Sequence, residues 1–68
     1  MKLIDLLRNL CLQTEITLKE DDKILIYKDF AFTPKGNITK SFKNFTNKNI
    51  YFITADNKDQ ITIYVKGE

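Results

Sequence analysis

Histidine and tryptophan are absent from this 68-residue chain, and cysteine occurs once, at Cys11. Histidine is the most frequent general base and metal ligand in proteins, so its absence removes the usual means of proton transfer and of metal binding. A single cysteine cannot complete a zinc site of the Cys/His type, and it lacks the histidine that normally activates a cysteine nucleophile. We therefore expect a protein that is not an enzyme, with no catalytic residues, no metal ligands and no cofactor.

The single cysteine also excludes an internal disulfide, on which secreted domains of this size commonly depend. The apolar start of the chain is interrupted by Asp5 and Arg8, which is unlike a secretory signal. No stretch approaches the roughly 18 apolar residues of a membrane span. The sequence predicts a soluble cytoplasmic protein without a membrane segment, in which the Cys11 thiol is a buried structural group.

Arginine, like cysteine, occurs only once. Arg8 is the only arginine among 11 cationic residues, which stand against 9 acidic ones and leave a net charge of +2. Arginine recognises phosphates and bases best because of its bidentate guanidinium, and nucleic-acid-binding domains usually carry a stronger and more clustered basic charge. With 2 glycines and 1 proline the chain is also a poor linker. We expect one globular domain, residues 1–68, with a thin core.

Two segments have the apolar spacing of a helix. Leucines recur at i, i+3, i+4 and i+7 from Leu3 to Leu10, which predicts a helix over residues 2–11. In the second segment Ile38, Phe42 and Phe45 are spaced i, i+4 and i+7, and Asn37 can cap the helix start. Both helices are expected to cover a sheet.

Four segments have the composition or alternation of strands. Apolar and polar residues alternate over residues 16–19, and a β-rich run follows at residues 24–27 after the turn "KEDDK". Two more strands, residues 50–54 and 60–65, flank the turn-rich loop "ADNKD". If Ile24 and Ile26 face the core, Lys28 would face it too. Because burying a lysine is costly, a bulge or a strand end is expected near Lys28 and Asp29.

These elements predict an α+β fold of two layers, with the order α-β-β-α-β-β. The two hairpins predict an antiparallel four-stranded sheet with one or two helices on one face. The other face of the sheet would then be bare. It is expected to carry Thr17, Tyr27, Thr62 and Tyr64.

The connector "KDFAFTPKG", residues 28–36, places two phenylalanines between lysines. At least one of Phe30 and Phe32 is expected to cover the core beside Phe42 and Phe45, and exposure of both would make the connector a partner site. Buried aromatic anchors dominate most interfaces. The predicted partner-binding residues are those of the bare sheet face and of this connector: Tyr27, Lys28, Phe30, Phe32, Lys35 and Tyr64.

The segments "MKLIDLLRNL", "TEITLKEDDKILIYK" and "NIYFITADNKDQITIYVKG" together resemble the short accessory proteins of phages and prophages of AT-rich Gram-positive bacteria. The shared features are a leucine-rich first helix, an immediate hairpin, a variable middle and a C-terminal hairpin. This resemblance implies a protein that acts in the host cytoplasm, where it binds and inhibits or modulates a host protein. A bacterial defence enzyme such as a CRISPR effector is one such target, which would make the protein an anti-CRISPR-like inhibitor. The resemblance carries over no functional residue.

Two alternatives stay open beside a host-protein partner. The first is a nucleic-acid-binding module, because aromatic platforms with basic grooves bind single strands. The aromatic and basic set for this role is Tyr27, Phe30, Phe32, Tyr51, Phe52 and Tyr64 with Lys28, Lys35, Lys40, Lys43, Lys48 and Lys66. The absence of an RRM signature and the low arginine count weigh against it. The second is a homodimer formed by edge-strand pairing or sheet stacking.

Overall fold

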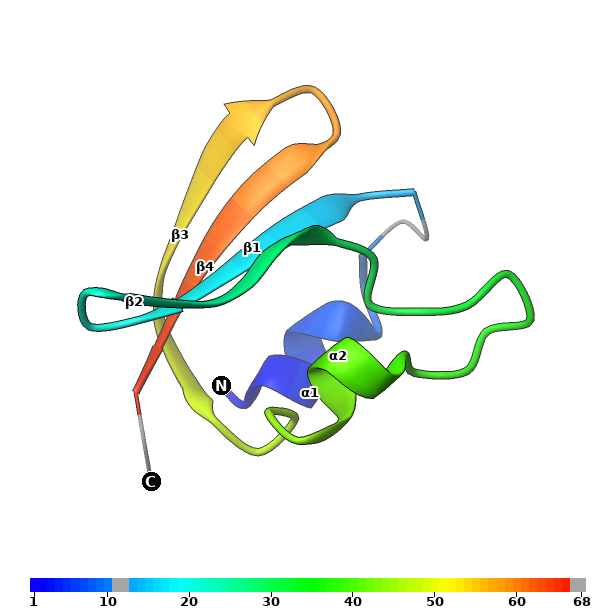
Figure 1. Ribbon diagram of the computed structural model, residues 1–68, viewed down its shortest axis with the longest axis horizontal. Helices are drawn as coiled ribbons and strands as arrows, with labels where there is room; N and C mark the ends of the chain where they lie inside the picture. Colours follow the sequence, from blue (N-terminus) through cyan, green and yellow to red (C-terminus); the bar gives the residue numbers. More distant parts are fainter. Residues whose placement is uncertain (11–12, 67–68) are drawn as a thin grey trace.

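The computed structural model describes residues 1–10 and 13–66 (Figure 1). The chain forms a small α+β domain that is mostly sheet. Its elements in chain order are α1 (Leu3–Leu7), β1 (Glu15–Glu20), β2 (Lys23–Asp29), α2 (Lys40–Lys43), β3 (Asn49–Asn57) and β4 (Gln60–Lys66). Cys11, for which burial was predicted, lies outside the described residues.

The predicted fold class is wrong, because the sheet is mixed and not antiparallel. The strand order is β2-β1-β4-β3. Each hairpin is antiparallel, β1 with β2 and β3 with β4, but the two hairpins join through parallel pairing of β1 and β4. The parallel register runs without interruption from Glu15↔Gln60 to Glu20↔Val65.

The connection between the hairpins explains the error. Residues 30–48 leave β2 at one edge of the sheet, pass beneath it and deliver β3 at the opposite edge (Figure 1). β4 then returns to the middle and lies beside β1. Apolar alternation tells which side chains face the core, but it contains no information about which strand is the neighbour.

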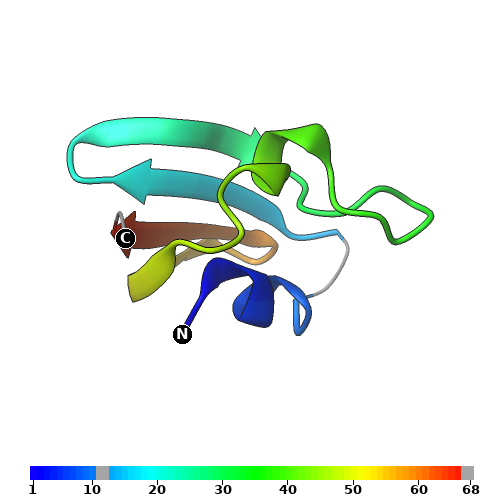
Figure 2. The same ribbon diagram turned by 90° about the horizontal axis from the view of Figure 1, so that it is seen from below.

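The core lies between the sheet and the two helices. Both helices are on the same side of the sheet, as Figures 1 and 2 show from two directions. Alternate side chains of the two central strands pack there against side chains of the helices. The fully buried members of this core are Leu3, Leu7, Ile16, Leu18, Phe42, Ile63 and Val65.

The first helix is shorter than the predicted span of residues 2–11. It ends at Leu7, and single backbone hydrogen bonds from Asn9 to Leu6 and from Leu10 to Leu7 continue it as turns. Asn9 also donates its side-chain amide to the carbonyl of Asp5, a local bond of the kind that competes with helix. Leu3 and Leu7 alone of the leucine stripe are fully buried.

The second helix begins at Lys40 and not at Asn37. Pro34 and Lys35 instead form a turn in which the Gly36 amide donates to the carbonyl of Thr33. The chain then pairs with itself, so that Ile38 lies opposite Phe32 in an isolated bridge. As the apolar spacing indicated, Phe42 is fully buried and Phe45 packs against the core.

Strand β2 contains the irregularity predicted near Lys28 and Asp29. Lys28 has a φ of 47°, in the left-handed region that favours glycine, and the register with β1 shifts beside it. A second shift comes earlier in the strand and places Ile24 opposite Lys19. For this reason Ile26 is buried as expected, whereas Ile24 is exposed on the other face of the sheet.

The turn between β1 and β2 allows a test of local backbone strain. Asp21 has a φ of 54°, while its neighbour Asp22 is not among the residues with positive φ. Two-residue hairpin turns with positive φ at the first central position favour glycine there. We expect Asp21→Gly to raise the free energy of unfolding by about 0.5 kcal/mol, because relief of left-handed strain outweighs the added freedom of the unfolded chain.

Asp22→Gly is the matched control, since it removes the same side chain without relieving strain. We expect it to lower the free energy of unfolding by about 0.5–1 kcal/mol. Urea unfolding followed by circular dichroism measures both variants. If the two substitutions change the free energy of unfolding equally and in the same direction, the backbone at Asp21 is not strained.

Candidate binding surface

The face of the sheet that points away from the helices is the candidate binding surface, and we refer to it as the open face. Thr17 and Lys19 alternate with the core residues of β1, and Thr62 and Tyr64 alternate with those of β4. The register of the hairpins and the ring contacts bring residues of the outer strands to the same side. We define the open face by Thr17, Lys19, Ile24, Tyr27, Lys28, Tyr51, Phe52, Thr62, Tyr64 and Lys66.

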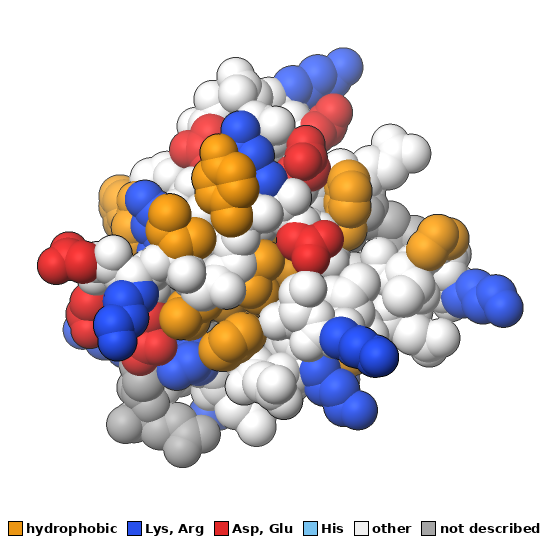
Figure 3. All heavy atoms as spheres, viewed as in Figure 1, with side chains coloured by type: hydrophobic (Ala, Val, Ile, Leu, Met, Phe, Trp, Pro, Cys, Tyr) orange, Lys and Arg blue, Asp and Glu red, His pale blue; other side chains and the backbone are white. Residues whose placement is uncertain are grey.

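Large apolar side chains of the two outer strands are exposed on this face. Their exposed fractions are 54% for Ile24, 66% for Tyr27, 50% for Tyr51 and 55% for Phe52. Figure 3 shows hydrophobic side chains at the surface with charged side chains between them. Apolar side chains gathered on one face of a small protein mark an interaction surface more often than apolar side chains scattered singly.

Three of the aromatic rings form a cluster around Tyr64. The ring centroid of Phe52 lies 5.5 Å from that of Tyr64 at an interplanar angle of 47°, and the Tyr51 centroid lies 6.3 Å away at 52°. Tilted rings at these separations attract one another through their quadrupoles. The cluster is therefore an ordered feature of the face, built from β3 and β4.

A lysine ammonium stands over each tyrosine ring of the open face. The distances from Nζ to the ring centroid are 5.8 Å for Lys19 over Tyr64, 5.4 Å for Lys28 over Tyr27 and 5.0 Å for Lys66 over Tyr51. These are cation–π contacts, which hold the positive charge close to the apolar groups. The open face thus combines exposed aromatic groups with positive charge.

Two threonines form the polar floor of the face, at its centre. Thr17 and Thr62 are paired across the parallel strands and are both buried. The Thr17 hydroxyl accepts a hydrogen bond from the Lys28 amide at 3.3 Å, and the Thr62 hydroxyl donates to the carboxylate of Asp56. Because both hydroxyls have partners, their burial carries little penalty.

The acidic groups near this face already have partners. Asp56 accepts the bond from Thr62, and the Glu15 carboxylate accepts a bond of 3.1 Å from the side-chain amide of Gln60. No lysine of the face is paired with a carboxylate within the described residues. Asp56 and Glu15 keep their negative charge because their donors are neutral, but the three lysines over the rings outnumber these two carboxylates, so the balance of charge here is positive.

The six predicted partner-binding residues divide into two groups. Tyr27, Lys28 and Tyr64 contribute to the open face, with Tyr64 half-buried within the aromatic cluster. Phe30, Phe32 and Lys35 belong to the connector. Lys35 is exposed in the turn of the loop that projects from the domain (Figure 1).

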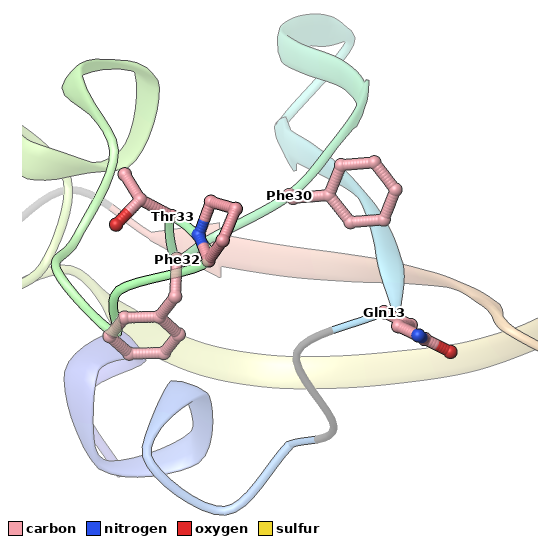
Figure 4. A pocket seen from close by; sticks show the side chains of 5 residues that line it. Gln13, Phe30, Phe32 and Thr33 are labelled. Atoms are coloured by element: carbon pink, nitrogen blue, oxygen red, sulfur yellow. The ribbon is translucent and has the colours of Figure 1, made fainter.

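The two phenylalanines of the connector differ in environment. Phe32 is half-buried and packs against the core, whereas 41% of Phe30 is exposed. Figure 4 shows the Phe32 ring directed toward α1 and the Phe30 ring turned away from it. The two rings line an open hollow of about 420 Å³ together with Gln13, Thr33 and Pro34. Phe32 is thus part of the structure, and Phe30 remains available at the surface.

Besides its two threonines, the open face has five residues that sequence reasoning left out of the predicted site: Lys19, Ile24, Tyr51, Phe52 and Lys66. Ile24 was assigned to the core because a register shift is not visible in an apolar run. Phe52 lies opposite Tyr64 only because the register shifts between Ala55 and Asn57, beside the "ADNKD" turn. Tyr51 joins the same face only because the register shifts between Ile50 and Phe52.

Comparisons of the chain with known protein families, curated proteins and solved structures found no match. Within residues 1–10 and 13–66, no group of three or more His, Cys, Asp or Glu side chains could hold a metal ion. No helix in the described part of the chain is long and apolar enough to cross a membrane. What the open face binds has to be inferred from its own residues.

Truncation of each connector phenylalanine tests their separate roles. We expect Phe32→Ala to lower the free energy of unfolding by about 1–3 kcal/mol, because it removes a ring that packs against the core. Phe30→Ala removes a more exposed ring, and we expect a loss below about 1 kcal/mol. Thermal and urea unfolding of the two variants provide the measurement. If Phe30→Ala lowers the free energy of unfolding more than Phe32→Ala does, then Phe30 is the structural residue and Phe32 is not.

Proposed function

We propose that this protein is a binding protein that holds a partner protein on its open face and performs no catalysis. The observation that carries the proposal is the exposure of Ile24, Tyr27, Tyr51 and Phe52 on a sheet face that no helix covers. Aromatic side chains are enriched at the centres of protein interfaces, where they supply most of the binding energy. Burial of these groups by a partner removes apolar surface from water.

Charge complementarity favours an acidic partner surface. Lys19, Lys28 and Lys66 keep their ammonium groups over the tyrosine rings, so a partner that covers the rings also meets three positive charges. Carboxylates around an apolar patch on the partner would pair with these lysines at the rim of the contact. A neutral or basic partner would leave the lysines without counter-charges in a partly dry interface.

The resemblance to phage and prophage accessory proteins supports a host protein as the partner. The proposed action is inhibition or modulation of that protein in the host cytoplasm, and a bacterial defence enzyme such as a CRISPR effector is the target class. An inhibitor of this kind needs no catalytic group of its own. Its effect comes from covering a functional surface of the target.

A double substitution on the open face tests this proposal. The protein, immobilised, is used to capture proteins from lysate of a Gram-positive bacterium, and captured proteins are quantified by mass spectrometry. We expect the partner to be lost with Tyr27→Ala/Phe52→Ala, because the variant lacks two exposed aromatic anchors. With the purified partner, calorimetry should show an affinity at least about tenfold weaker for the double variant.

Phe30→Ala is the matched control, since it removes an exposed phenylalanine that belongs to the connector and not to the sheet. We expect it to retain the partner with unchanged affinity. Loss of the partner in Phe30→Ala, with retention in the double variant, would move the site to the connector. If both variants capture the same proteins as the unmodified chain, the open face is not the binding site.

Nucleic-acid binding is the second candidate, and the lysine positions are the observation that favours it. Three cations beside exposed rings are the elements of a single-strand platform. However, a base stacks on the face of a ring, and each tyrosine ring here already has an ammonium over it. This candidate ranks below a protein partner because Arg8 is the only arginine, and arginine is the residue that best recognises phosphates and bases.

Fluorescence anisotropy with labelled single-stranded DNA and RNA distinguishes the two candidates. At low salt, where phosphate contacts are strongest, we expect no binding tighter than about 10⁻⁴ M, the weak limit of non-specific association. If binding is tighter than this, falls steeply with salt and is lost in Tyr27→Ala/Phe52→Ala, the ligand of the open face is a nucleic acid and not a protein.

A further inference from the structure

The outer edge of β3 is open over most of its length. Its inner edge pairs with β4, and at its start the amide of Ile50 donates to the carbonyl of Met1 at 2.9 Å while Lys2 bridges to Asn49. From Tyr51 to Asn57, no other segment of residues 1–10 and 13–66 pairs with this edge. The backbone donors and acceptors that point outward there are free to pair with another strand.

The side chains along this edge carry no charge from Ile50 to Ala55. Tyr51 and Phe52 are exposed on the open face, and Ile53 is exposed on the helix side, where 42% of its surface is accessible. Edge strands are usually protected by lysine, proline or an inward charge, because an apolar edge pairs readily with other chains. This segment has none of these, although the register of β3 with β4 shifts twice, beside Tyr51 and between Ala55 and Asn57.

The opposite edge of the sheet, formed by β2, is protected in the usual ways. Lys23 begins the strand and Lys28 lies near its end, whereas β3 contains no lysine. Lys28 has left-handed backbone geometry, which interrupts the flat row of donors and acceptors that a new strand needs. Of the two edges, β3 is therefore the one that accepts a strand.

We propose that β3 pairs with β3 of a second copy of this chain, in antiparallel orientation about a two-fold axis. The uncharged segment of β3 supports a second copy as the occupant. The chain has a net charge of +2, so two copies repel each other over most of their surfaces, and the uncharged segment of residues 50–55 is where they approach without like charges facing. In a two-fold contact the same segment lies on both sides, which matches apolar groups with apolar groups.

The dimer forms one continuous sheet through both copies. With the axis at Ile53, the two Ile53 side chains meet on the helix side, and on the open face Phe52 of each copy lies diagonal to its counterpart. The two open faces become a single larger surface with the aromatic clusters at its middle. The contact is small compared with the roughly 1,200–2,000 Å² of a standard stable interface, so the dimer is expected to be weak and concentration-dependent.

Sedimentation velocity of the purified chain tests the pairing over concentrations from about 10 μM to about 1 mM, a range that covers weak association. We expect the mass to rise from that of the 8.0 kDa monomer toward twice that value. Ile53→Lys places a charge on the β3 edge and should keep the protein monomeric throughout. Ile24→Lys is the matched control on the β2 edge, at a residue that is 54% exposed, and should dimerise like the unmodified chain.

A monomer at all concentrations would overturn the proposal, as would a dimer that Ile24→Lys abolishes or that Ile53→Lys leaves intact. Unfolding curves show whether each variant is folded. If Ile53→Lys is not, Ala55→Lys provides the same test, because Ala55 is exposed on the same strand. Hydrogen exchange gives an independent measurement: amides of residues 51–55 should exchange more slowly at high protein concentration, and those of β2 should not. None of these measurements uses a partner protein, so their failure is separate from failure of the proposed function.

Discussion

The parallel pairing of β1 with β4 is the interaction on which the rest of the structure depends. A two-stranded hairpin is marginally stable at best in water, and this chain consists largely of two hairpins. The pairing runs in one unbroken register along β1, between segments far apart in the sequence, and combines the hairpins into one sheet. It also places Leu18 beside Ile63, so that both hairpins contribute to the apolar surface that the helices cover.

This pairing requires the connection of residues 30–48 to span the whole width of the sheet, and several contacts hold the connection in place. The Asp29 carboxylate accepts hydrogen bonds from the Phe30 amide and the Ser41 hydroxyl, each at 2.8 Å, and so ties the end of β2 to α2. Phe42 is buried beneath the sheet. At the far end Lys48 forms a half-exposed ion pair with Glu20 at 2.9 Å, a contact worth little in energy but consistent with this path.

Sequence patterns predicted which face of the sheet a side chain lies on better than they predicted which strands are neighbours. Alternation along β4 correctly placed Ile63 in the core and Tyr64 on the open face, because side-chain direction follows from the two-residue period alone. The parallel neighbour of β4 could not be predicted in this way, since it depends on where a long connection ends. The same limit affected Ile24 and Tyr51, whose sides are set by register shifts between strands. For the candidate site, Tyr27 and Tyr64 were therefore found and Phe52 was not.

The lysines over the tyrosine rings explain how an apolar face of this kind can coexist with water and still select a partner. In the free protein each ammonium covers part of a ring, an interaction worth about 0.5–1 kcal/mol at an exposed site. A partner that covers the rings has to displace these lysines, and only one that offers carboxylates in return recovers the lost energy as ion pairs. The same three lysines that contact Tyr27, Tyr51 and Tyr64 would thus impose a cost on any partner that does not supply negative charge.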